Sequence, residues 1–268
     1  MKATAAIAVN VFRESVRDKV LYNLVLFAIV LIGASYMIGQ LTAGQDVKII
    51  KDLGLAATSV FGLFIAVFIG IGLVSKEVER RSIYSLLAKP IRRAQLVAGK
   101  YCGLVLTLAV NVAVMATALY VVLAFMSWGV SEGVARTWDA PALDPALLKA
   151  IALILVELML VTAIALFFST FSTPMLSAAF TFGFFIVGHF SEDLRNFQDV
   201  VDSPAAARLA RGLYWVLPNL AQFDVKAAVV HGQPVSVGYM AIAVSYAACY
   251  IGMLLVISMY VFSRRDFK

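Results

Sequence analysis

The charged residues of this chain are grouped, and the uncharged stretches between the groups constrain the fold more than any other feature. A helix needs about 20 residues to cross the hydrocarbon core of a bilayer. Four stretches of at least that length carry no charge: residues 20–45, 53–75, 101–131 and 227–263, the last of which is broken near Pro234 and continues as a span from about residue 237. Residues 150–190 hold one charge, Glu157, and a polar break that ends at Pro174 divides them into two helices. We predict six spans, at about residues 20–39, 54–75, 101–128, 150–168, 174–190 and 237–262.

Composition excludes a soluble domain. Of the 268 residues, 62% are hydrophobic and only 14% are charged, and the mean hydropathy is +0.91. A soluble fold has too little interior to bury that much apolar surface. We therefore predict an all-α polytopic transmembrane bundle, organised as one transmembrane domain over residues 1–268.

Basic residues set the expected orientation, because Lys and Arg near span ends are retained on the cytoplasmic side. With six spans, the side that holds both termini carries fourteen of the 22 basic residues and five of the 16 acidic ones. We expect both termini in the cytoplasm and the chain in a cell membrane, such as the bacterial cytoplasmic membrane. The basic balance indicates contact with lipid headgroups rather than nucleic acid, since no basic groove interleaved with aromatic residues is present.

Shorter helices are expected outside the spans. Residues 4–19 place Ile7, Val11 and Ser15 on one side and charges elsewhere, which predicts an elbow helix at the interface; a plain extension of the first span is the alternative. Before the last span, two short helices at 205–217 and 220–232 are expected to lie on the outer leaflet, anchored by Tyr214, Trp215 and Phe223.

The cytoplasmic segment between the second and third spans has an unusual pattern, KEVERRSIYSLLAKPIRRAQLVAGK, at residues 76–100. Ser82 is placed to cap a short helix with an apolar face, and Pro90 stops that helix. A short isolated helix is marginal in water, so we expect it to be buried against a partner protein. The alternative is an interfacial helix held on lipid headgroups by its basic residues.

This segment resembles the ABC-2 type permease family, whose members carry an acidic pair, Gly-Thr, a Leu-Leu helix, a proline, a basic residue and a downstream Gly-Lys after the second span. The matching residues here are Glu77 and Glu79, Ser82, Leu86 and Leu87, Pro90, Arg92 or Arg93, and Gly99 with Lys100. The chain departs from the pattern at Arg81, where a glycine is common. Its opening, FRESVRDKVLYN, is most similar to the branch that includes the nitrous-oxide reductase maturation permease.

The resemblance implies a coupling helix that docks into a nucleotide-binding ATPase subunit. The residues it assigns to coupling are Glu77, Glu79, Arg81, Ser82, Ile83, Tyr84, Leu86, Leu87 and Pro90. It also implies a second copy of the chain, or a similar permease, in the same transporter. The motor is expected on another polypeptide, with its ATP and Mg²⁺, because VAGKYCG lacks the upstream glycine and the final hydroxyl of a phosphate loop. We expect no cofactor and no enzymatic site in this chain.

Polar residues within the spans are the other candidates. Glu157 falls midway along the fourth span, where a carboxylate is costly and suggests a substrate path, a proton role or a dimer seam. Asn111 is a second candidate for the path or seam, and with Thr107 it could form an interhelical hydrogen bond. His189, expected at the outer end of the fifth span, and His231, in the outer loop, make a weak metal site.

Two other classes of function stay open. A secondary transporter would be expected to show interrupted helices in related halves, which are not visible in the sequence. An intramembrane enzyme needs catalytic groups that face one another inside the spans, and the two histidines are expected at the edge or outside. Neither alternative accounts for the pattern in residues 76–100.

Overall fold

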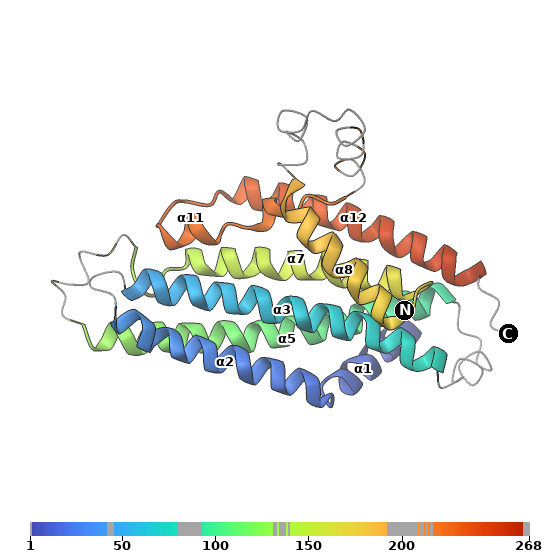
Figure 1. Ribbon diagram of the computed structural model, residues 1–268, viewed down its shortest axis with the longest axis horizontal. Helices are drawn as coiled ribbons and strands as arrows, with labels where there is room; N and C mark the ends of the chain where they lie inside the picture. Colours follow the sequence, from blue (N-terminus) through green and yellow to red (C-terminus); the bar gives the residue numbers. More distant parts are fainter. Residues whose placement is uncertain are drawn as a thin grey trace.

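The computed structural model describes residues 2–41, 46–79, 93–130, 133, 138, 140–191, 208, 212, 214 and 217–264, without the side chains of residues 2, 73–79, 93 and 262–264. Within these residues the regular structure is helical and no strand occurs. The long helices lie side by side in an elongated bundle (Figure 1). The predicted all-α helical bundle is confirmed.

Five helices of the described residues are long and apolar enough to cross a membrane. They are α2 (Lys19–Gln40), α3 (Asp46–Glu79), α5 (Arg93–Trp128), α7 (Ala146–Ser169) and α12 (Val237–Arg264). Each of them contains one predicted span. The helices α3 and α5 are longer than predicted, because a helix can continue into polar surroundings where hydropathy no longer signals it.

The predicted fifth span, 174–190, corresponds to α8 (Pro174–His189), which is apolar but only 16 residues long. At 1.5 Å per residue it measures about 24 Å, which is short of the roughly 30 Å hydrocarbon core. It begins where the sequence predicts a break: Thr173 is an extended N-cap residue, and Pro174 lies in the first turn, where its missing N–H loses no helical hydrogen bond.

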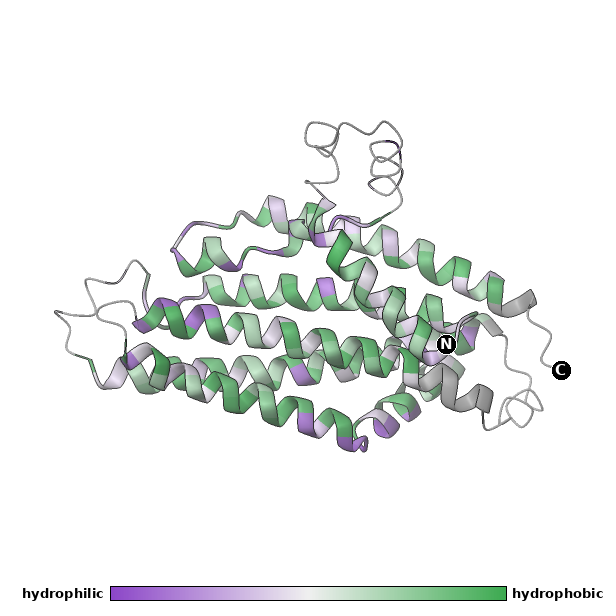
Figure 2. Ribbon diagram, viewed as in Figure 1, coloured by the Kyte–Doolittle hydropathy of each residue, from purple (hydrophilic) through white to green (hydrophobic). Residues whose placement is uncertain are grey.

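The helix α7 is at the centre of the bundle, and α2 and α12 are at its periphery. The buried share of the most apolar window is 72% in α7, against 22% in α2 and 17% in α12. Large apolar side chains are exposed along the two peripheral helices, which are mostly green in the hydropathy view (Figure 2). Lipid tails solvate such surfaces as well as a protein interior would.

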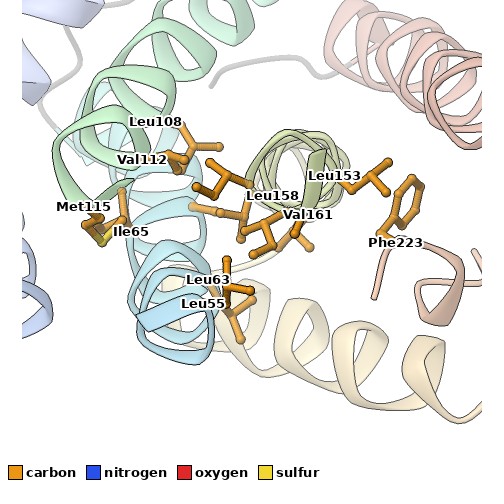
Figure 3. Packing of buried hydrophobic residues seen from close by; sticks show 14 of the residues in the cluster. Leu55, Leu63, Ile65, Leu108, Val112, Met115, Leu153, Leu158, Val161 and Phe223 are labelled. Atoms are coloured by element: carbon orange, nitrogen blue, oxygen red, sulfur yellow. The ribbon is translucent and has the colours of Figure 1, made fainter. Parts of the chain in front are cut away.

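Close helix contact in the core depends on small residues. The position of a Cβ on Gly70 of α3 would be 2.7 Å from the Cβ of Ala165 of α7, and one on Gly62 would overlap Leu158. Around this α3–α7 contact, α5 completes a tightly packed apolar layer (Figure 3). Its labelled members are buried: Leu55, Leu63, Ile65, Leu108, Val112, Met115, Leu158 and Val161.

After α8, the next continuous described segment begins at residue 217 and contacts the end of that helix. The backbone N–H of Leu220 donates to the carbonyl oxygen of Gly188 (3.0 Å). From there a 3-10 turn, η2 (Ala221–Phe223), and a short helix, α11 (Lys226–Val230), pack against α3 and α7. The fifth crossing is therefore discontinuous, with α8 in one half of the bundle and residues 217–230, here called the return segment, in the other.

The return segment corrects the expectation that residues 220–232 lie on the outer leaflet. Leu220, Phe223 and Val229 are fully buried, and Phe223 faces Leu153 of α7 (Figure 3). The apolar side chains that suggested an anchor in lipid instead fill the space left by the short α8. Of the other expected helix, only residues 208, 212, 214 and 217 are described.

The predicted elbow helix is α1 (Lys2–Ser15). Its predicted apolar side is confirmed, since Val11 and Ser15 are buried and Ile7 is partly buried. That side packs against the start of α5. Asp18 then turns the chain into α2 by accepting a hydrogen bond from the N–H of Val20 (3.0 Å).

Candidate functional site

The helices α3 and α5 hold the two ends of the predicted coupling segment. The first ends at Glu79 and the second begins at Arg93, so residues 80–92 connect their ends. Glu77 and Glu79 lie in the last turns of α3, where the described part of the chain includes the backbone alone. The other residues assigned to coupling lie outside the described residues: Arg81, Ser82, Ile83, Tyr84, Leu86, Leu87 and Pro90.

The elbow helix is attached to the same end of α5. A Cβ on Gly103 would come within 2.6 Å of the Ala8 carbonyl oxygen and 2.7 Å of the Val11 Cβ. One turn earlier, a Cβ on Gly99 would be 2.8 Å from the Ile7 Cβ. Such close approach makes α1 and the base of α5 one packed unit, so a displacement of residues 80–92 that moves α5 also moves α1.

A second polar site lies inside the bundle, where α8 ends. Glu157, at the middle of α7, is 1% exposed, and its Oε1 is 3.2 Å from Nε2 of His189. The direction of this contact falls outside hydrogen-bond geometry, and neither carboxylate oxygen has a hydrogen-bond partner among the described residues. The expectation that His189 lies at the outer end of a full span is wrong, because α8 stops at the depth of Glu157.

The two ring nitrogens of His189 face different groups. Nδ1 lies 3.0 Å from the carbonyl oxygen of Phe185, and a carbonyl oxygen only accepts, so Nδ1 carries a hydrogen. Nε2 is the nitrogen that faces Oε1 of Glu157.

The return segment brings two further charges to this depth. They belong to Asp224 and Lys226, whose charged atoms are 3.5 Å apart. Nζ of Lys226 is also 3.5 Å from Oγ of Ser59, at the middle of the α3 span. Ser59, Glu157, His189, Asp224 and Lys226 form what we call the midplane cluster, which draws side chains from α3, α7, α8 and the return segment.

Among the described residues, Asn111 and Thr107 form no hydrogen bond between helices. The Asn111 amide donates to the Thr107 carbonyl oxygen (2.7 Å), and the Thr107 hydroxyl donates to that of Gly103 (3.0 Å). Both bonds stay within α5, because the i to i−4 carbonyl is the nearest acceptor in a helix. The spacing allowed an interhelical hydrogen bond, but each side chain bonds within α5, and both are buried in the packing of the bundle.

The potential metal ligands of the midplane cluster are Glu157, His189 and Asp224. Among the described residues, no three or more His, Cys, Asp or Glu side chains are grouped so that they could hold an ion. Sequence reasoning selected Glu157 by its charge but missed its pairing with His189, and it missed Ser59 and Lys226. These residues were missed because the sequence analysis did not predict that residues 217–230 return into the bundle. The apolar residues around Phe223 could have indicated that return.

Comparison with known families agrees with this architecture. Residues 5–194 match the family model described as "ABC-2 family transporter protein". This range covers most of the chain, from the elbow helix through α8 and the predicted coupling segment. A comparison with curated proteins finds no match. The chain is a multi-pass membrane protein that belongs to the ABC-2 transporter family.

Proposed function

We propose that this chain is the membrane-spanning permease subunit of an ABC transporter and that a separate nucleotide-binding subunit hydrolyses the ATP. The family match over residues 5–194 carries the proposal. The sequence supports the division of labour, since it contains no phosphate loop. The chain then needs no enzymatic site and no cofactor of its own, and ATP with Mg²⁺ binds to the partner.

The coupling route runs through residues 80–92. The two flanking helices are longer than a membrane crossing needs: α3 has 34 residues and α5 has 36, about 50 Å each, against a hydrocarbon core of roughly 30 Å. The segment is thereby held away from the hydrocarbon core at both ends. In our proposal Leu86 and Leu87 dock in a groove of the ATPase subunit, and neighbouring charges orient them.

Motion would spread from that segment along two packed contacts. One runs from α5 to the elbow helix through Gly99 and Gly103, and the other runs from α3 to α7 through Gly62 and Gly70. Closure of the motor subunits on ATP would displace both helices, and two permease copies would rock against each other. A second copy of this chain, or a similar permease, completes the transporter in this proposal.

Both termini are assigned to the cytoplasm. The supporting observation is that α1, the end of α12 and the helix ends that flank residues 80–92 lie at the same end of the bundle (Figure 1). Positive charges also concentrate there, as expected for a cytoplasmic side.

Of the two polar residues considered for the path or the dimer seam, Glu157 keeps that role in the proposal. Its carboxylate has unused hydrogen-bonding capacity, which is unusual for a buried group and typical of functional sites. The Asn111 amide is already bonded within α5, so Asn111 is the weaker candidate.

Copurification tests this function. The tagged wild-type chain, purified from its own cells, is expected to retain an ATPase subunit in about equal amount. The Leu86→Glu/Leu87→Glu variant should insert normally and lose that subunit. Leu143→Glu, at an exposed site in the outer connection, is the matched control and should retain it. Retention by the double variant would refute docking through this face.

A further inference from the structure

A pocket of about 250 Å³ opens where the elbow helix turns into α2. Its walls are apolar and come from α2 and α3, and its floor includes Gly72. Phe68 is half exposed, so the pocket faces outward from the bundle. The lining side chains of the wall are Val20, Leu21, Leu24, Ile65, Phe68 and Ile69.

Acidic residues line this pocket, and basic residues lie next to it. Glu14, Ser15 and Asp18 line it, and Glu14 also borders a neighbouring hollow formed with Asn10, Arg13 and Arg17. Asn10, Arg13 and Glu14 share one face of α1 by their i, i+3, i+4 spacing, and Arg17 lies in the turn that follows the helix. Glu14 and Asp18 thus line the apolar pocket itself, and Glu14 joins it to a hollow that holds the guanidinium groups of Arg13 and Arg17.

Ser15 supplies an independent sign of a ligand. The residue is only 6% exposed, and its hydroxyl has no hydrogen-bond partner among the described residues. Leaving a buried hydroxyl unpaired is costly. An ester or phosphate oxygen at the mouth of the pocket would accept its hydrogen and remove that cost.

We propose that this elbow pocket binds a phospholipid with an amine headgroup, phosphatidylethanolamine, from the leaflet at the side of the termini. An acyl chain fills the apolar pocket, and the Ser15 hydroxyl donates to an ester oxygen. The phosphate lies between Arg13 and Arg17, which suit it by their forked donors. The ammonium group lies against Glu14. The site goes beyond the proposed transport function and does not depend on it.

Charge complementarity selects this lipid over an anionic one. Phosphatidylglycerol offers a phosphate to the arginines but no cation to Glu14 or Asp18. Asp18 is already fixed by its bond to the Val20 N–H (3.0 Å), yet its charge still faces the mouth. A zwitterionic headgroup matches both signs, and losing one charge-assisted hydrogen bond corresponds to about a tenfold change in affinity.

Lipid titration of the purified full-length chain, followed by native mass spectrometry, tests the site. Delipidated wild type is expected to bind phosphatidylethanolamine about tenfold more tightly than phosphatidylglycerol. Glu14→Gln should abolish that preference by weakening binding of the amine lipid. Equal affinities of wild type for the two lipids would overturn the proposal.

A pocket-filling variant separates this site from other lipid contacts. A Cβ at Gly72 meets no atom within 4 Å, and the same is true at Gly33, which is exposed on α2 outside the pocket. Gly72→Leu should fill the pocket and lower affinity for phosphatidylethanolamine about tenfold, whereas Gly33→Leu should bind like wild type. Unchanged binding by Gly72→Leu would overturn the assignment, as would a cross-link from Phe68→Cys to a second copy of the chain that excludes the lipid.

Discussion

Oε1 of Glu157 and Nε2 of His189 lie 3.2 Å apart at the point where α8 ends. The contact joins residues 32 positions apart in sequence and fixes the tip of a half-length helix to the middle of α7. The other ring nitrogen of His189 faces the carbonyl oxygen of Phe185. An acidic and a basic side chain thus meet at the junction between α8 and the return segment.

Removing His189 should destabilise the protein more than neutralising Glu157. The His189→Ala variant leaves the buried carboxyl group without its facing partner, so we expect a loss of about 2 kcal/mol in the free energy of unfolding. Glu157→Gln keeps the shape and removes the charge, so we expect a smaller loss. Reversible denaturation of the full chain in mixed micelles measures both.

The double variant Glu157→Gln/His189→Ala controls for effects outside the pair. A coupling energy of about 1 kcal/mol is expected, since His189 matters less once the charge at 157 is gone. If the two single losses simply add, the contact contributes nothing to stability.

The discontinuous fifth crossing predicts a sharp difference in thiol accessibility between the return segment and the loop that follows it. In a background with Cys102 and Cys249 replaced by Ala, Val229→Cys should react with an impermeant maleimide about tenfold more slowly than Gln233→Cys, because Val229 is fully buried and Gln233 is exposed. Equal rates would place residues 220–232 on the outer surface, as the sequence alone suggested.

The docking of the elbow helix on α5 predicts that replacing Gly103 with a larger residue destabilises the protein. Val at this position would collide with the Ala8 carbonyl and the Val11 side chain, and such overpacking costs about 1–3 kcal/mol. Gly33→Val, with open space around its Cβ, is the matched control. Thermal unfolding of the two variants should differ by several degrees, and similar melting temperatures would argue against the α1–α5 contact.

The helices themselves were accessible from the sequence because each depends on local pattern. The uncharged stretches located all five long helices, Thr173 and Pro174 marked the start of α8, and the spacing of Ile7, Val11 and Ser15 gave the buried side of α1. Glu157 was selected by the cost of a charge in the membrane. These inferences require no knowledge of which helix packs on which.

The partners of these residues could not be predicted in the same way. His189 meets Glu157 only because α8 is short and tilted against α7, and no pattern near either residue encodes that depth. Apolar side chains such as Phe223 and Leu220 can anchor a segment in lipid or fill a protein core. Here they are buried, because the short α8 leaves space in the bundle that they fill. Asn111 and Thr107 have the spacing for an interhelical bond but find acceptors in their own helix.

The account depends most on the docking of residues 80–92 to an ATPase subunit, and site-specific photocross-linking tests that contact directly. A photoreactive amino acid at position 86, in place of Leu86, is predicted to cross-link in intact cells to a second polypeptide that contains a phosphate loop and hydrolyses ATP. The same group at Val256, exposed on α12, should cross-link to lipid. Cross-linking of position 86 to lipid alone would contradict the account and favour an interfacial helix on headgroups.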